Sequence, residues 1–228
     1  MEVLDWHAAL APRREPIDGQ TVRLEPLDPA RHGEDLFQAT ADADSTWEYL
    51  PYGPFADRQE FMAWLARRAP VDDPLTFTII DKEARAARGL ASLMRMDPAN
   101  GVIEIGHIWL SPALQRTRQA TEAIFLMARY VFEQLANRRF EWKCNAANEP
   151  SRRAAERFGF VFEGVFRQHM VVKGRNRDTA WYSITDGEWP SRRAAFEAWL
   201  SPENFDSAGR QRRSLSALRE GIQATPER

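Results

Sequence analysis

The pattern of hydrophobic and polar positions predicts strands and helices that alternate along most of the chain. Apolar runs rich in β-branched and aromatic residues, and bounded by Gly, Pro, Asn or Asp, are typical of strands. About seven such runs occur, at residues 21–27, 75–81, 87–96, 102–110, 139–144, 160–172 and 178–185. Gly89 and Gly106 interrupt two of these runs, which predicts a bulge or a close approach of two backbones at each glycine.

Helices are predicted between several of these runs. After Thr117, apolar residues recur at the spacing of one helical stripe, at Ile124, Met127, Ala128, Val131 and Leu135. Shorter helices are expected after Asp28 and Asp57, and after Asn148 or Glu149, all of which suit an N-cap. Gly159 follows the last of these helices and is typical of a helix end.

Changes in composition divide the chain into three parts. Residues 1–20 contain prolines and show no sustained periodicity, so we expect an arm laid over the domain, with Trp6 as an anchor. Residues 21–188 make up the predicted α/β domain. Residues 189–228 are expected to form a helical extension, with helical spacing at 191–200 and 215–222.

Composition and charge exclude several classes of protein. The 228 residues are 43% hydrophobic and include 13 Phe and 8 Trp, enough for a sizeable core. The net charge of −2 creates no general attraction to nucleic acid or to an anionic membrane. The single cysteine, Cys144, excludes an internal disulfide and a multi-cysteine metal centre. No signal peptide and no membrane span are recognisable, so we expect a cytoplasmic, soluble protein without a metal.

A candidate anion site lies where the strand at 102–110 gives way to the following helix. Gln115, Arg116, Thr117, Arg118, Gln119 and Ala120 form this connection. A turn here directs unpaired N–H groups, the positive end of a helix dipole and two guanidinium groups at one point. Phosphate or pyrophosphate is the anion that suits this arrangement best.

These residues resemble the phosphate loop of the GCN5-related N-acetyltransferases, and in particular the branch of ribosomal-protein alpha-amino acetyltransferases (RimJ/RimL type). The family pattern is Gln/Arg-x-x-Gly-x-Gly/Ala, and this chain keeps Gln115 and Ala120 but carries Arg118 in place of the first glycine. A second and more specific signature of the family is present at Asn148, Ser151, Arg157, Gly159, Phe160, Glu163 and Gly164.

The resemblance implies a fold and a coenzyme. The implied fold is a mixed, mostly antiparallel twisted α/β sheet of about seven strands, splayed between the fourth and fifth strands and flanked by helices. The implied coenzyme is acetyl-CoA, whose pantetheine arm pairs with the fourth strand in the gap. The residues implied to bind it are Trp109, Leu110, Gln115, Arg116, Thr117, Arg118, Gln119, Ala120, Thr121, Asn148 and Ser151.

Two residues are candidates for catalysis. By resemblance, the hydroxyl of Ser151 lies near the coenzyme sulfur and protonates the leaving thiolate; the alternative is that Ser151 only caps a helix. Glu104 lies on the fourth strand, and its burial would make the carboxylate a better proton acceptor; the alternative is an ion pair with an arginine. The ribosomal-protein enzymes carry a further glutamate where this chain has Met170, which argues against the same acceptor mechanism.

The acceptor pocket is expected beside the aromatic segment 47–55. Trp47, Tyr49 and Tyr52 would form one wall, unless the segment is only a hydrophobic clamp between helices. His107 and His169 are further candidates for substrate contact. A peptide N-terminus, a polyamine, an amino acid and an amine antibiotic all remain open as acceptors.

The leading hypothesis is therefore direct acetyl transfer from acetyl-CoA to a primary amine in a ternary complex. The alternative is a catalytically silent acyl-CoA-binding regulatory domain. A homodimer is possible, because edge strands and helical tails in this family often pair subunits, whereas no nucleic-acid partner is expected.

Overall fold

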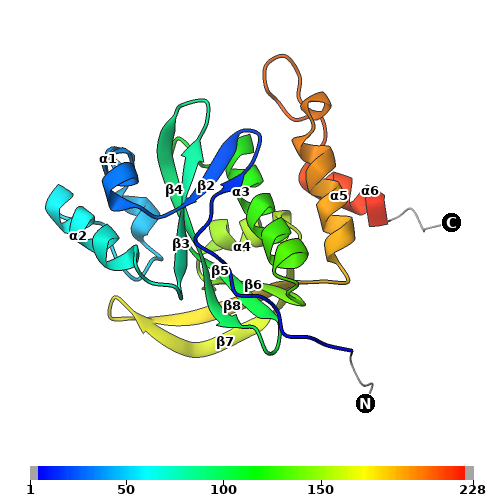
Figure 1. Cartoon of the computed structure of the whole chain (residues 1–228), viewed down its shortest axis with the longest axis horizontal. Coiled ribbons are helices and arrows are strands. Elements are labelled where there is room, and N and C mark those ends of the chain that lie inside the picture. The colour runs from blue at the N-terminus through cyan, green and yellow to red at the C-terminus, as the bar shows by residue number, and fades with distance from the viewer. Residues whose placement is uncertain (1–4, 224–228) are drawn as a thin grey trace.

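A single sheet organises the chain, and a computed structural model describes it for residues 5–223. The strand order is β1-β2-β3-β4-β5-β6-β8-β7, and every neighbouring pair is antiparallel except β5 and β6 (Figure 1). The strands are β1 Ile17–Asp18, β2 Val22–Pro26, β3 Leu75–Asp81, β4 Ala86–Asp97, β5 Val102–Leu110, β6 Arg139–Asn145, β7 Val161–Val172 and β8 Arg175–Thr185.

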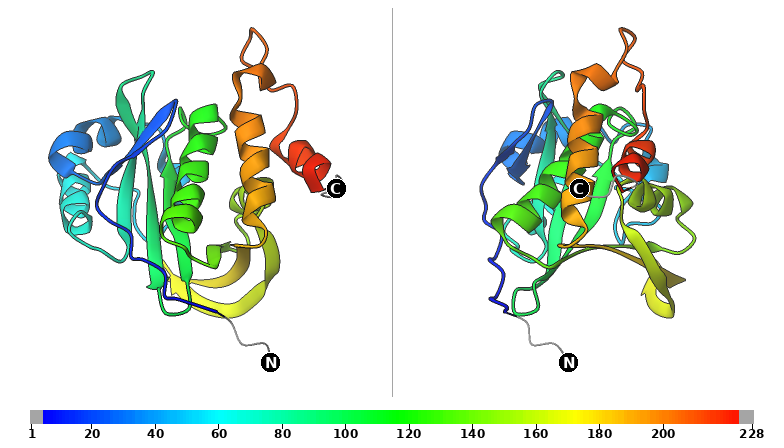
Figure 2. Two further views of the ribbon diagram at one scale, coloured as in Figure 1. Left: turned by 45° about the vertical axis from the view of Figure 1, so that its right-hand side comes forward. Right: turned by 90° about the vertical axis from the view of Figure 1, so that its right-hand side faces the viewer.

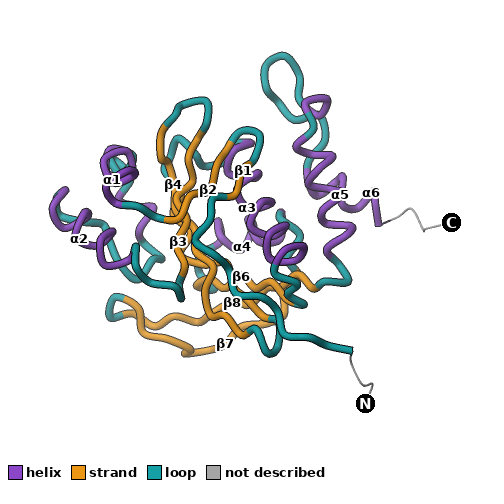
Figure 3. The backbone as a smooth tube through the Cα atoms, in the orientation of Figure 1, coloured by secondary structure: helices purple, strands orange, loops and turns teal. Residues whose placement is uncertain are grey.

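Helices cover both faces of this sheet, as Figure 3 shows. They are α1 Pro29–Gln38, α2 Arg58–Arg68, α3 Arg118–Arg129, α4 Glu149–Arg157, α5 Trp189–Leu200 and α6 Leu215–Gln223. Short turns at Asp44–Trp47 and Pro202–Asn204 are 3-10 helical, and Tyr130–Gln134 continues α3 as a π-helical turn. One apolar cluster lies between the sheet and the α1–α2 pair, and a larger one lies between the sheet and α3, α4 and α5.

The predicted fold class is confirmed, and most predicted elements lie at their expected residues. The predicted caps are present, since Asp28, Asp57 and Asn148 each accept a hydrogen bond from an amide in the first turn of α1, α2 and α4. The short strand β1 was not predicted. Strand β8 begins three residues earlier than expected because Lys173 and Gly174 both have positive φ, which allows a tight turn directly after β7.

The expected splay is present between β5 and β6. Their parallel pairing runs from Val102 opposite Arg139 to Ile105 opposite Trp142 and then ends. At that point β5 also carries a bulge: on β4, Leu90 pairs with Trp109 and Ser92 with Gly106, and His107 between them has a φ of 50°. Beyond the bulge, β5 diverges from β6 and leaves a gap in the sheet.

Both glycines that interrupt strands mark close approaches. A Cβ at Gly106 would lie 2.5 Å from Met94 Sδ, and one at Gly89 would lie 2.9 Å from the Trp109 carbonyl oxygen. A methyl group at residue 89 would therefore push against backbone next to the gap. The prediction is confirmed in a different form at each position: Gly89 lies at a close approach of two backbones, and Gly106 lies at the bulge in β5.

The N-terminal segment crosses the sheet and is fixed to it by hydrogen bonds at several places along its length. The Trp6 indole donates to the Ala99 carbonyl at 2.8 Å, which confirms this residue as an anchor. Near β2, the Glu122 carboxylate of α3 accepts from the amides of Gln20 and Thr21. Residues 1–4 of the expected arm, and residues 224–228 of the expected extension, lie outside the described residues.

The C-terminal segment stands beside α3, as both views in Figure 2 show. Helix α5 packs on α3 through Phe196 and Trp189, whose ring centroids lie 5.4 and 6.2 Å from that of Phe125. The residues after α5 then reach back toward the N-terminal end of α3. None of the helices described for residues 5–223 combines the length and apolar character needed to cross a membrane.

Candidate active site

A cleft of about 1400 Å³ follows the gap between β5 and β6. Ligand pockets commonly enclose ~300–1,000 Å³, so the cleft has room for a large coenzyme together with a second substrate. We call its two ends the α3 end and the β8 end. The α3 end is lined by residues 115–121 together with Ile124 and Arg157, and the β8 end by residues that include Glu104, His107, Lys143, Met170 and Arg177.

The α3 end presents free backbone donors. Thr117 caps α3, and its hydroxyl accepts from the Ala120 amide at 3.1 Å. The four amides of residues 116–119 have no acceptor within the described part of the chain. Arg116 has a φ of 61°, so the left-handed residue of this loop is an arginine. Free amides at the positive end of a twelve-residue helix make a strong anion site.

Arg118 lines this end of the cleft, and its guanidinium is held by the C-terminal extension, which lines the cleft there as well. Its guanidinium donates to the Leu200 carbonyl and lies 5.1 Å from the Phe205 ring, both in the C-terminal extension. Arg118 has no positive φ, so replacing the family's glycine does not strain the backbone. A carbonyl and a ring of the C-terminal extension thus hold this guanidinium at the wall of the cleft, and its contact to a phosphate stays a prediction.

Arg157 at the α3 end was not predicted as a site residue. Its guanidinium donates to the Thr121 hydroxyl at 3.1 Å and lies about 5 Å from the rings of Phe158 and Trp199. It makes no ion pair with any described carboxylate, and burial lowers its pKa. The signal was available, because Arg157 belongs to the second family signature. The side chain is positioned to add a positive charge beside the free amides.

The middle of the cleft contains the two residues predicted on α4. Asn148 caps this helix by accepting from the Ser151 amide at 3.1 Å. The Ser151 hydroxyl in turn accepts from the Trp142 indole N–H at 3.0 Å and lies within hydrogen-bonding reach of the Cys144 thiol. Because Trp142 supplies the donor, the hydroxyl proton of Ser151 is free to be donated elsewhere. Burial raises the pKa of Cys144, so this thiol is a poor nucleophile.

The two coenzyme contacts predicted at the end of β5 differ in their access to the cleft. Leu110 lines it, and its carbonyl already accepts from the Gln115 side chain at 3.0 Å. The Trp109 side chain is 1% exposed and does not line the cleft. Its indole donates to Thr46 at 2.9 Å and stacks on Trp47 at 4.9 Å. Only the backbone of Trp109 remains available for the predicted contact.

Glu104 lies at the β8 end and is 3% exposed. Its carboxylate pairs with the Arg95 guanidinium at 2.8 Å and with the Lys143 ammonium at 3.1 Å. Lys143 also pairs with Glu141 at 2.7 Å. An ion pair with an arginine was the alternative to a catalytic role for Glu104, and the structure shows this pair with Arg95. Lys143 is a second cationic partner, which was not expected.

His107 reaches the cleft from the bulge in β5. Its Nδ1 atom lies 2.8 Å from the Tyr52 hydroxyl, and the two rings are stacked. Burial, together with the positive charges of Arg68, Arg95 and Arg177, lowers the pKa of His107 to about 3. Burial raises the pKa of Tyr52 to about 12. Both side chains are therefore neutral near pH 7.

This buried imidazole predicts a loss of stability in mild acid. The His107 pKa falls from 6.5 in the unfolded chain to about 3 in the folded protein, so the unfolded state binds the proton first. The neutral imidazole therefore makes its full contribution to the free energy of unfolding above pH 6.5, and this contribution is lost as the pH falls toward 3. Between pH 6.5 and 4.5, the wild type is expected to lose about 2 kcal/mol more than His107→Asn. Urea denaturation across this range measures the difference, and parallel curves for the two proteins would contradict it.

The other predicted acceptor residues are only partly brought together. Tyr49 lines the cleft, and its hydroxyl donates to the Ala147 carbonyl at 3.3 Å. Trp47 is 1% exposed and does not line the cleft, since it fills the core of the aromatic clamp that was the alternative. Tyr52 lies behind His107. His169 is exposed and lies outside the cleft wall, because a bulge between Phe166 and Met170 turns Met170 inward.

The tip of the β7–β8 hairpin contacts the aromatic segment 47–55. The Lys173 ammonium donates to the carbonyls of Trp47 and Gly53, the first at 2.9 Å. In Figure 1 this hairpin runs beneath the sheet toward α2. Together with the Tyr49 contact to Ala147, this joins the segment to both neighbouring walls of the cleft.

This combination of a splayed sheet, a phosphate-type loop and a cleft between β5 and β6 defines an acyl-coenzyme-binding class of protein. A family model described as an acetyltransferase (GNAT) domain matches residues 21–161, so the chain belongs to the GNAT acetyltransferase family. The chain is similar to a GCN5-related N-acetyltransferase from Brucella melitensis, for which a crystal structure is known. The two sequences are 53% identical, and the two structures match with a TM-score of 0.93. That match covers 95% of this chain and 99% of the other.

Two further similarities are narrower. The ribosomal-protein-serine acetyltransferase of Escherichia coli (strain K12) is 32% identical over 95 residues, which are 42% of this chain and 52% of that protein. The chain thus spans about half the length of this curated relative. RimL, a ribosomal L7/L12 alpha-N-protein acetyltransferase solved with coenzyme A, matches with a TM-score of 0.65 at 21% identity, over 75% of this chain and 99% of that one. At that identity the match shows a common fold alone. The family predicted from the two motifs is confirmed.

Proposed function

We propose that this protein is an acetyl-CoA-dependent N-acetyltransferase that transfers the acetyl group directly to a primary amine in a ternary complex. The observation that carries the proposal is the continuity of one cleft from the free amides at the start of α3 to the polar β8 end. Such a cleft can hold a long phosphorylated coenzyme and an acceptor at the same time. Cys144 is buried and carries a raised pKa, which favours direct transfer over a covalent acyl-enzyme.

The residues of the cleft fit the coenzyme that the family uses. The amides of residues 116–119 and the guanidinium of Arg157 provide donors and positive charge for phosphate groups. The unpaired part of β5 provides backbone groups for an extended chain. Asn148 lines the middle of the cleft, where its amide can hold the pantetheine arm. Acetyl-CoA supplies the acetyl group as an activated thioester.

Two side chains of the protein are assigned to the chemistry. Ser151 gives its hydroxyl proton to the leaving sulfur. The Trp142 indole N–H already donates to the hydroxyl oxygen, which leaves the proton of the hydroxyl free to be donated. Glu104 lies on the acceptor side and collects the proton released by the amine, directly or through water. Its partners Arg95 and Lys143 hold this carboxylate in position.

The acceptor is proposed to be a primary amine on a peptide end or a small molecule. The name of the E. coli relative makes an amine of a ribosomal protein one candidate. Met170 lines the β8 end of this chain, where that branch of the family is expected to carry a glutamate. A ribosomal-protein acceptor would therefore be bound here without that carboxylate.

The test combines coenzyme binding with thiol release. Calorimetry should detect binding of coenzyme A, and a panel of primary amines should give free thiol from acetyl-CoA. Ser151→Ala is expected to lower kcat at least ~10-fold with coenzyme affinity unchanged, because general acid catalysis contributes ~10²-fold or more. Ser191→Ala is the matched control, because Ser191 is also a serine in the first turn of a helix but lies outside the cleft.

Each outcome separates the hypotheses. Binding of the coenzyme without thiol release from any amine would favour the silent regulatory domain. Absence of binding heat at millimolar coenzyme would refute both. Equal loss of activity in Ser151→Ala and Ser191→Ala would assign the effect to helix stability rather than to proton donation.

A further inference from the structure

Arg177 is an arginine of the β8 end without an ion-pair partner among the described residues; Glu104 acts on it only from a longer distance. Its Nε donates to the Thr179 hydroxyl at 3.2 Å, and no described carboxylate lies within ion-pair distance of its guanidinium. The side chain is half-buried and lines the cleft, and burial lowers its pKa. Leaving a guanidinium partly desolvated without an anion is costly, which indicates that the partner comes from outside the chain.

The charges around Arg177 strengthen this argument. Four cationic side chains surround this end of the cleft, namely Arg68, Arg95, Lys143 and Arg177. Two buried carboxylates, Glu104 and Glu141, offset them, and both are already engaged by Lys143. At the rim, Glu48 and Lys173 contribute opposite charges. Arg68, Lys173 and Glu141 do not line the cleft, but Arg95, Lys143 and Arg177 do and outnumber the lining carboxylates of this end, Glu48 and Glu104, so the cleft wall here is positive.

Polar contacts make this a built site rather than a loose surface cluster. Thr179, which fixes the Arg177 Nε, is 1% exposed and also contacts His169 Nδ1 at 2.9 Å. Lys143 lies 3.7 Å from the centroid of the Trp181 ring and its side chain is 5% exposed. These contacts hold two cations in place before any ligand arrives. Preorganised cations of this kind favour an anion over water.

From this geometry we infer that the acceptor amine carries a carboxylate within a few atoms of its nitrogen, and that Arg177 binds this carboxylate. The inference rests on the proposed function and names its acceptor class. An arginine can hold a carboxylate through two parallel hydrogen bonds, which also orients the amine. Polyamines and cationic amine antibiotics are disfavoured, because like charges repel at the same place. The carboxylate is either the α-carboxylate of a free amino acid or an acidic side chain at a peptide N-terminus.

The same charges assist the reaction. A positive environment favours the neutral form of the amine over its ammonium form, and only the neutral amine attacks the thioester. The amine nitrogen forms a bond to the acetyl carbon, the carbon–sulfur bond breaks, and the amine proton leaves toward Glu104. A carboxylate on the acceptor then offsets the electrostatic cost of bringing the substrate into this field.

Thiol release with matched acceptors tests the inference. One pair compares free amino acids with their amides, and the other compares peptide amides that begin with Asp with those that begin with Asn. For one of the two pairs, kcat/KM should be at least ~10-fold higher for the acid, since a hydrogen bond to a charged group contributes ~1.5–3 kcal/mol. The pair in which the acid has the higher kcat/KM identifies the source of the carboxylate. Equal or better turnover of the uncharged members in both pairs would overturn the inference and leave the proposed function intact.

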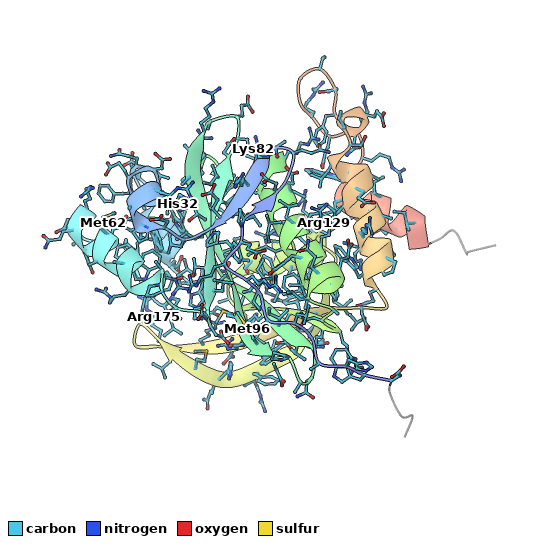
Figure 4. All side chains as sticks on the ribbon, in the orientation of Figure 1. His32, Met62, Lys82, Met96, Arg129 and Arg175 are labelled. Carbon is cyan, nitrogen blue, oxygen red and sulfur yellow. The ribbon has the colours of Figure 1, made fainter. Side chains whose placement is uncertain are left out.

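Variants on β8 connect the preference to one side chain. Arg177→Gln is expected to abolish the preference for the acid, measured as the ratio of kcat/KM for the acid and the amide within the same variant. Arg175→Gln is the matched control, because Arg175 is an exposed arginine near the hairpin tip (Figure 4) and does not line the cleft. A retained preference in Arg177→Gln would contradict the assignment. Coenzyme affinity, measured by calorimetry, should be the same in all three proteins.

A binding measurement tests the site independently of catalysis. N-acetylglycine and N-acetyl-aspartyl amide are probes that carry the anion next to an acetylated nitrogen. With coenzyme A present, at least one should bind the wild type at millimolar concentration, whereas N-acetylglycinamide and Arg177→Gln should show no such binding. Equal binding of acid and amide probes, or no binding of either acid, would refute the carboxylate site even if no acceptor is turned over.

Discussion

Replacing Trp47 with alanine is expected to lower the free energy of unfolding by about 3–5 kcal/mol. The side chain is 1% exposed and stacks on Trp109 with ring centroids 4.9 Å apart. It also makes edge contacts with Tyr52, Phe55, Phe61 and Trp64. Removing the indole leaves a large cavity among rings that cannot collapse together. Urea denaturation of the purified variant measures the loss.

Two control variants separate the cavity from a general effect of losing tryptophan. Trp6→Ala removes a half-buried indole from the surface and should lower the free energy of unfolding clearly less than Trp47→Ala does. Trp47→Phe keeps part of the packing and should recover much of the stability. Because Tyr52 and His107 pack against the same cluster, Trp47→Ala should also weaken acceptor binding more than coenzyme binding. Equal losses in Trp47→Ala and Trp6→Ala would show that the clamp does not stabilise the fold.

Lys143→Met is expected to destabilise the protein by roughly 3 kcal/mol, the low end of the cost of breaking a buried ion pair. The ammonium lies between the carboxylates of Glu104 and Glu141, at 3.1 and 2.7 Å. Its removal leaves two buried negative charges close together. Arg95 and Arg139 each remain as a partner for one carboxylate, which limits the loss. Chemical denaturation at pH 7 is the appropriate measurement.

Two further variants test whether the loss of stability in Lys143→Met comes from the buried charges. One breaks an exposed ion pair, and the other removes a second charge from the same buried cluster. Arg153 pairs with Glu149 at 2.8 Å with both side chains mostly exposed, so Arg153→Met should change stability by only ~0.3–0.5 kcal/mol. Adding Glu104→Gln to Lys143→Met should restore part of the stability, because it removes the repulsion between the carboxylates of Glu104 and Glu141. A double variant less stable than Lys143→Met alone would contradict this electrostatic account.

Local signals in the sequence were sufficient for most of the fold. The caps at Asp28, Asp57 and Asn148 act through bonds to amides two or three residues away, so their effect can be recognised from neighbouring residues. The alternation of apolar residues located β3 and β5 at their observed bounds. Both signals depend on interactions within a few residues, and these are the interactions that a single sequence shows directly.

What could not be predicted at the candidate site depends on long-range contacts. The guanidinium of Arg118 is held by Leu200 and Phe205, more than eighty residues later, which offer a carbonyl and a ring. Arg177 was not predicted because its significance depends on the absence of a nearby carboxylate after folding. Glu104 was recognised as a buried acid, but its second cationic partner, Lys143, comes from a different strand.

The hydrogen bonds from Lys173 to the carbonyls of Trp47 and Gly53 have a consequence for the size of the substrate. Together with the Tyr49 contact to Ala147, they hold the aromatic segment 47–55 to the β7–β8 hairpin on one side and to the turn before α4 on the other. We expect an amine on a small or mobile group, such as a free amino acid or the end of a polypeptide, to be accepted more readily than an amine held close to the surface of a folded partner.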